Sequence, residues 1–160
     1  MKRLLILYSE YTPVIDAIKY SLQELAEVVC AERVPENKEK YDLIVLSNYN
    51  GKVDFEAVNI HYSLLPAFTG NEPVKDAILA GVKVTGVTVF YTKSKKIISQ
   101  YPIFIHNDMH YEEVLEELKY IAQTLYPQVI EKIIKNELFE TRSLMAQGYG
   151  CSGGCAKCKK

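Results

Sequence analysis

The stretch from residue 58 to residue 91 constrains the fold of this chain more than any other part of the sequence. It opens with a short apolar segment in which Asn59 and His61 stand two positions apart, so in a strand both side chains leave the same face. A turn-rich segment and a short helix follow, and a β-branched run at 84–91 predicts the next strand. A polar pair at a strand end, beside a loop and a helix N-terminus, is where α/β folds place binding sites.

The apolar pattern of the whole chain predicts an α/β fold with a doubly wound, mainly parallel sheet. Continuous apolar runs of strand length at 2–8 and 41–47 are typical of buried parallel strands. A helix is expected to begin at Pro13, which suits the first turn, and its apolar residues recur at helical spacing. A long helix is expected over about 111–135, where Pro127 either bends it or starts a second helix. Strands alternating with helices favour a Rossmann-like arrangement.

Length and composition indicate one globular domain and exclude several classes of partner. The chain has 160 residues, of which 48% are hydrophobic and 24% charged, as in ordinary globular proteins with their own core. A net charge of −1 gives no reason to expect binding to nucleic acid or to a membrane surface. No apolar run approaches the roughly 18 residues of a membrane span, and no signal-peptide pattern is present. We therefore predict a cytoplasmic location, a domain over 1–140 and a separate C-terminal segment at 141–160.

Three motifs follow one another in the central stretch. They are Asn59-Ile60-His61, then Ser63-Leu64-Leu65-Pro66, then Thr85-Gly86-Val87-Thr88. Together they resemble the folate-dependent formyltransferases, most of all the phosphoribosylglycinamide formyltransferases, with features of the methionyl-tRNA formyltransferase branch. The resemblance covers roughly residues 41–140. It implies a formyltransferase fold, 10-formyltetrahydrofolate as the one-carbon donor and an unidentified amine as the acceptor.

The resemblance implies that Asn59 and His61 carry the chemistry of formyl transfer. When an amine attacks a formyl carbon, negative charge builds on the formyl oxygen and the amine must lose a proton. An asparagine amide and an imidazole supply the hydrogen-bond donor and the proton carrier that this reaction needs. Asn59 would hold the formyl oxygen, and His61 would polarise it or shuttle the proton. The alternative is that this polar pair only caps a strand and fixes the loop that follows.

The same resemblance implies a folate site in the loops beside this pair. In the family, the strand that ends here at Leu46 continues into a loop whose backbone helps to hold the pterin. The corresponding loop of this chain, 48–52, is short and polar. The residues implied in cofactor binding are Leu46, Ser47, Asn48, Tyr49, Ser63, Leu65, Pro66 and Gly70.

Three departures from the family's pattern limit what the resemblance implies. The family carries an aspartate after the T-G-x-T strand that orients the histidine, but this sequence has no acidic residue between Asp76 and Asp108. The family's glycine-rich turn holds a sugar phosphate, whereas here Glu10 and Pro13 occupy that turn, so glycinamide ribonucleotide is not the expected substrate. The region before residue 41 is also abbreviated. A catalytically inactive protein of this fold is therefore the second hypothesis.

Three cysteines near the C-terminus predict a metal or redox site. Cys151, Cys155 and Cys158 follow a C-x3-C-x2-C spacing among glycines and lysines. Thiolates at this spacing suit zinc or an iron–sulfur cluster, with a further ligand from elsewhere. The alternative is a glycine-rich tail whose thiols are reactive but bind no metal. Under the second hypothesis this segment, not the central stretch, would carry the activity.

Overall fold

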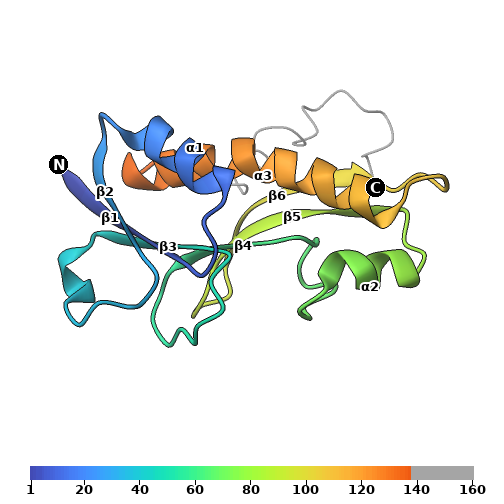
Figure 1. Cartoon of the computed structure of the whole chain (residues 1–160), viewed down its shortest axis with the longest axis horizontal. Coiled ribbons are helices and arrows are strands. Elements are labelled where there is room, and N and C mark those ends of the chain that lie inside the picture. Colours follow the sequence, from blue (N-terminus) through green and yellow to red (C-terminus); the bar gives the residue numbers. More distant parts are fainter. Residues whose placement is uncertain (138–160) are drawn as a thin grey trace, which may run out of the picture.

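A six-stranded sheet organises residues 1–137, the part of the chain that this computed structural model describes (Figure 1). The spatial order is β2-β1-β3-β4-β5-β6. Neighbours from β2 to β4 are parallel, whereas β4 with β5 and β5 with β6 are antiparallel. The predicted α/β fold with a mainly parallel sheet is confirmed. The strands are β1 (Lys2–Tyr8), β2 (Ala26–Ala31), β3 (Leu43–Ser47), β4 (Val58–His61), β5 (Val84–Tyr91) and β6 (Ile97–Phe104).

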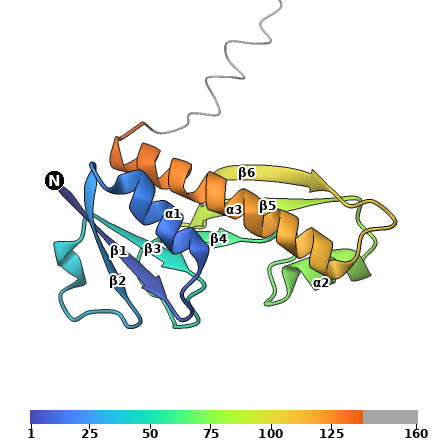
Figure 2. The same ribbon diagram turned by 45° about the horizontal axis from the view of Figure 1, so that its top comes forward.

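Two of the helices in the described residues, α1 (Pro13–Leu22) and α3 (Tyr111–Ile134), lie side by side across one face of the sheet (Figures 1 and 2). The short helix α2 (Pro73–Leu79) packs Val74 against β5 and the first half of α3. The opposite face of β1 and β3 is covered by loops around the 3-10 helix η1 (Lys38–Lys40). No helix in residues 1–137 is long and apolar enough to cross a membrane.

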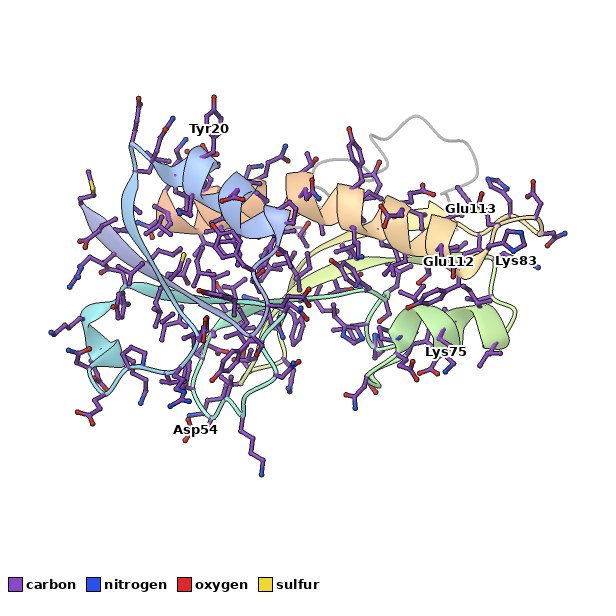
Figure 3. The ribbon with its side chains drawn as sticks, viewed as in Figure 1. Tyr20, Asp54, Lys75, Lys83, Glu112 and Glu113 are labelled. Carbon is purple, nitrogen blue, oxygen red and sulfur yellow. The ribbon has the colours of Figure 1, made fainter. Side chains whose placement is uncertain are left out.

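The first strand is apolar throughout because both of its faces are buried. Leu4 and Ile6 pack against α1 and α3, whereas Leu5 and Leu7 pack into the loop-covered side. All four side chains have 0% exposure. The side chains of Tyr20, Asp54 and Lys75 lie on the outside of the molecule and project away from the sheet (Figure 3). The continuous apolar run thus correctly predicts a central strand.

Helix α3 continues through Pro127 to Ile134, so this proline does not start a second helix. The residue before it, Tyr126, is fully buried and joins α3 to the middle of the sheet. Its hydroxyl lies 2.7 Å from the Leu46 carbonyl oxygen and 2.9 Å from that of Val58. Burial raises the pKa of Tyr126 well above its usual value, which keeps the hydroxyl protonated as a donor. Tyr126 therefore ties α3 to the end of β3 and to the start of β4, the strand that carries the candidate site.

Candidate active site

Strand β4 presents Asn59 and His61 at its carboxyl end. Val58 and Ile60 pack toward the α1–α3 core, so strand alternation leaves Asn59 and His61 on the other face. Both side chains are half-buried. Antiparallel pairing places His61 directly opposite Thr88 of β5. The polar pair is therefore carried by a paired strand and not by a free loop.

Hydrogen bonding fixes the orientation of the Asn59 amide. Its Oδ1 accepts a hydrogen bond from the backbone N–H of Ile60 at 2.8 Å. Because a backbone N–H can only donate, the oxygen of the amide must face it and the Nδ2 group remains as a donor. Asn59 thus offers a hydrogen-bond donor to a ligand.

A backbone carbonyl fixes the tautomer of His61. Nε2 lies 2.8 Å from the carbonyl oxygen of Phe68. Since a carbonyl oxygen only accepts, Nε2 carries the proton and Nδ1 is the acceptor in the neutral ring. Phe68 reaches this position in the left-handed backbone region, at φ 52°. Within residues 1–137, therefore, a carbonyl and not a carboxylate orients His61.

The loop that carries Phe68 is held in place by β5 and β6. Thr88 Oγ1 donates to the Ser63 carbonyl at 2.6 Å and accepts from the Leu65 backbone N–H at 3.1 Å. Gln100 Nε2 donates to the Leu65 carbonyl at 2.9 Å. Below the loop, a Cβ added at Gly86 would overlap the Tyr101 carbonyl oxygen and lie 2.6 Å from Leu64 Cδ2.

These contacts explain why the sequence motifs contain these residue types. In the T-G-V-T motif, Thr88 provides the hydrogen bonds that hold the S-L-L-P loop, and Gly86 leaves the space that this loop needs. The loop in turn places the Phe68 carbonyl on His61. The three motifs therefore form one assembly that sets the orientation of the imidazole.

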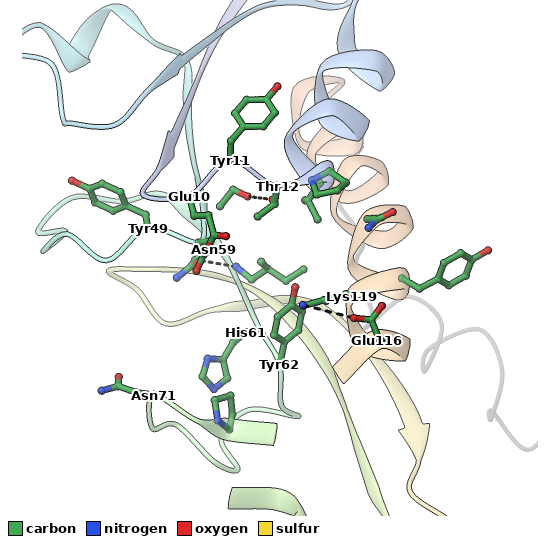
Figure 4. Close-up of a pocket in the computed structure, with 18 of the residues that line it drawn as sticks. Glu10, Tyr11, Thr12, Tyr49, Asn59, His61, Tyr62, Asn71, Glu116 and Lys119 are labelled. Carbon is green, nitrogen blue, oxygen red and sulfur yellow. Dashed lines mark hydrogen bonds and ion pairs between the residues drawn. The ribbon is translucent and has the colours of Figure 1, made fainter. Parts of the chain in front are cut away.

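Asn59 and His61 open into a pocket of about 840 Å³ (Figure 4). The pocket lies among the start of α1, the ends of β3 and β4, the loop before α2, and one side of α3. Three of its lining side chains are charged, and the others include amides, hydroxyls, tyrosine rings and a few apolar groups. The charged ones are Glu10, Glu116 and Lys119, of which Glu116 and Lys119 form an exposed ion pair at 3.9 Å.

Residues 38–130 match the family model described as formyl transferase, which is more than half of the chain. The chain belongs to the formyl transferase family. Its N-I-H, S-L-L-P and T-G-V-T motifs all lie within the matched segment. The resemblance read from these motifs is thus confirmed at the level of the family.

Two curated family members illustrate the relationship. A phosphoribosylglycinamide formyltransferase of Bacillus subtilis (strain 168) is 37% identical over 94 residues, covering 56% of this chain and 46% of that protein. A methionyl-tRNA formyltransferase of Lysinibacillus sphaericus is 38% identical over 81 residues, covering 48% of this chain and 26% of that protein. The matches therefore span less than half of the length of these relatives.

A solved formyl transferase structure superposes over most of this chain. The phosphoribosylglycinamide formyltransferase from Bacillus halodurans is similar at a TM-score of 0.70 and 26% identity, covering 85% of this chain and 97% of its own. The likeness in fold therefore extends over more of the chain than residues 38–130, which match the family model.

The pocket brings together six of the residues predicted for a formyl transferase site and leaves out four. Leu46 is buried, and its carbonyl accepts from Tyr126. Ser63 is buried and donates to the Ala67 carbonyl at 2.6 Å, while Leu65 is held by Thr88. Pro66 lies on the exposed side of the same loop. Those in the lining are Ser47, Asn48, Tyr49, Asn59, His61 and Gly70.

Helix α3 supplies pocket residues that motif analysis of this chain misses. Glu116, Lys119, Tyr120 and Gln123 recur at a spacing of three and four positions, so they form one polar stripe along the helix. This stripe runs beside the apolar stripe that packs on the sheet. The spacing was readable in the sequence, but nothing there shows which polar face of α3 borders a pocket.

The predicted metal site at Cys151, Cys155 and Cys158 lies outside the described residues and stays a prediction, as does the predicted boundary at residue 140. Within residues 1–137 no group of three or more histidine, cysteine or acidic side chains could hold a metal ion. The remaining cysteine, Cys30 in β2, is partly buried, and this burial raises the pKa of its thiol.

Proposed function

We propose that the pocket binds 10-formyltetrahydrofolate and that Asn59 and His61 promote transfer of its formyl group to an amine. The observation that carries the proposal is the complementary hydrogen-bond state of the two side chains. The Nδ2 group of Asn59 remains a hydrogen-bond donor for a ligand, and Nδ1 of His61, in the neutral ring, remains an acceptor. Both residues line one pocket of a formyl transferase fold. Formyl transfer needs this combination of a donor and a proton acceptor.

The pocket fits a folate in size and in polarity. Its volume of about 840 Å³ lies within the range of ordinary small-molecule sites. Ser47, Asn48 and Asn71 offer donors and acceptors to a heteroaromatic ring, and Tyr49 and Tyr62 offer apolar ring surface. Burial raises the pKa of Tyr62, so its hydroxyl stays a neutral donor. When bound, the folate would supply the formyl group.

Each of the two strand residues would then have one task. Asn59 Nδ2 would donate to the formyl oxygen as that atom gains negative charge. His61 Nδ1 would accept the proton that the attacking amine loses and return it to the folate nitrogen as the bond from that nitrogen to the formyl carbon breaks, while Nε2 stays bonded to the Phe68 carbonyl. The Phe68 carbonyl orients the ring as a carboxylate would, but an uncharged oxygen stabilises the imidazolium less. A cytoplasmic location and a metal site in the cysteine segment remain predictions beside this proposal.

Folate binding is testable by thermal unfolding of the full chain with and without a stable 10-formylfolate analogue. At about 100 times the dissociation constant, a ligand specific for the folded state adds about 2.7 kcal/mol of stability. For a domain of this size that corresponds to roughly 5 to 10 °C in melting temperature. The matched control is p-aminobenzoylglutamate, which lacks the pterin and should give a smaller shift. Equal melting temperatures with and without the analogue, at any concentration, would contradict a folate site.

A further inference from the structure

The end of the pocket beside α1 carries an exposed carboxylate that is hydrogen-bonded to the neighbouring loop. Glu10 lines the pocket, and its Oε2 accepts a hydrogen bond from Asn48 Nδ2 at 3.2 Å. The backbone N–H of Ser9 donates to the Asn48 carbonyl at 3.0 Å, and that of Asn50 donates to Ser9 Oγ at 2.9 Å. Three hydrogen bonds thus tie the loop before α1 to the loop after β3. The loop that carries Glu10 is thus connected to the loop after β3, and the Glu10 carboxylate has a hydrogen-bond partner there.

The groups around Glu10 offer little to an anion. Pro13 has no N–H at the start of α1, and the N–H of Ile15 already bonds the Thr12 carbonyl at 2.9 Å. The Tyr11 hydroxyl donates to Asp16 at 2.6 Å. The pKa of Lys19 is raised, chiefly by its electrostatic interaction with Tyr11. Beside Tyr11, the positive charge of Lys19 and the negative charge of Asp16 therefore offset each other.

The described pocket lining has one negative charge in excess. It contains two carboxylates and one ammonium, and the ammonium of Lys119 is shared with Glu116 on α3. Glu10 is therefore the unbalanced charge. A ligand group that reaches this end is attracted if it is cationic and repelled if it is a phosphate.

Resting on the proposed function, we propose that the formyl acceptor is an amine with a second cationic group and no phosphate, and that Glu10 selects it. One nitrogen of such an acceptor would face Asn59 and His61, and the other would lie against the Glu10 carboxylate. Two observations support this assignment: the Glu10 carboxylate accepts a hydrogen bond from Asn48, and Glu10 lines the same pocket as Asn59 and His61. Glu10 acts here as a specificity-determining residue and takes no part in the transfer.

Two probes test this assignment: they share an amine on a four-carbon chain, and the other end is an ammonium in one and a phosphate in the other. We would follow the amide NMR spectrum of the full chain during titration with the linear diamine putrescine and with its counterpart aminobutyl phosphate. Wild-type protein should bind putrescine more tightly, with shifts centred on residues 9–12 and 47–50. Glu10→Gln keeps an acceptor for Asn48 but should weaken putrescine about two- to fivefold, the range of solvent-exposed charge pairs. Glu10→Lys should reverse the order of the two probes.

The matched control is Glu24→Gln, an exposed carboxylate beyond the opposite end of α1, which should leave both affinities unchanged. Equal or tighter binding of aminobutyl phosphate by the wild type would overturn the inference, as would unchanged putrescine affinity in Glu10→Gln. The titration needs no folate, so it separates the two proposals. Formyl transfer to phosphorylated amines would overturn the charge assignment alone. The predicted preference without any formyl transfer would support the assignment and count against the proposed function.

Discussion

Asn59→Ala is expected to slow formyl transfer by about 10² to 10³-fold, the usual effect of losing one donor to a developing oxyanion. The variant removes Nδ2, the part of the amide that the Ile60 bond leaves available. Its melting temperature should change little, because the side chain is only half-buried and β4 remains paired with β5. The measurement is the single-turnover rate of wild type and variant with saturating donor.

Two further substitutions sharpen the interpretation of Asn59. Asn59→Asp keeps an oxygen for the Ile60 N–H and replaces the donor with a second oxygen, so it should be at least as slow as Asn59→Ala. Asn37→Ala removes an exposed amide that does not line the pocket, and should leave the rate within a few-fold of wild type. A rate for Asn59→Asp close to that of wild type would mean that Asn59 only shapes the loop.

His61→Gln is expected to slow transfer by about 10² to 10⁴-fold, the usual contribution of a general acid or base. A glutamine amide can still donate to the Phe68 carbonyl in place of Nε2, but it has no group equivalent to Nδ1. The loop should therefore stay in place while the proton acceptor is lost. Rates would be compared together with melting temperatures, so that a folding defect is not mistaken for lost chemistry.

The matched control for His61→Gln is His106→Gln, an exposed histidine that does not line the pocket. It should retain the wild-type rate. If His61→Gln also retained that rate, the imidazole would serve only to fix the loop. That result would support the interpretation of Asn59 and His61 as a polar cap on a strand.

The regular elements follow from local patterns in the sequence, and this explains why they could be predicted. The apolar run of β1 is read correctly because alternate residues are buried on opposite faces. The end of α2 is also determined by a local signal, because Gly81 adopts φ +72°, a backbone region that glycine enters at low cost. The family motifs lie within a matched segment, so they indicate the superfamily without knowledge of distant contacts.

The contacts that build the pocket depend on residues far apart in sequence, and local patterns could not predict them. Tyr126 joins β3 and β4 across 80 and 68 positions. The polar stripe of α3 borders the pocket only because α1 and α3 pack on the same face of the sheet. The Phe68 contact is closer in sequence, but it depends on a left-handed backbone at a phenylalanine, for which no residue preference gives a signal.

Turnover of 10-formyltetrahydrofolate by the wild-type chain tests the central claim most directly. The protein would be incubated with the donor and a mixture of primary amines, and tetrahydrofolate and formylated amines would be measured together. Equal formation of the two products, lost in Asn59→Ala, is the result that we predict. Stabilisation by the folate analogue with neither product formed would contradict the claim, and would identify a pocket that binds the donor without transferring its formyl group.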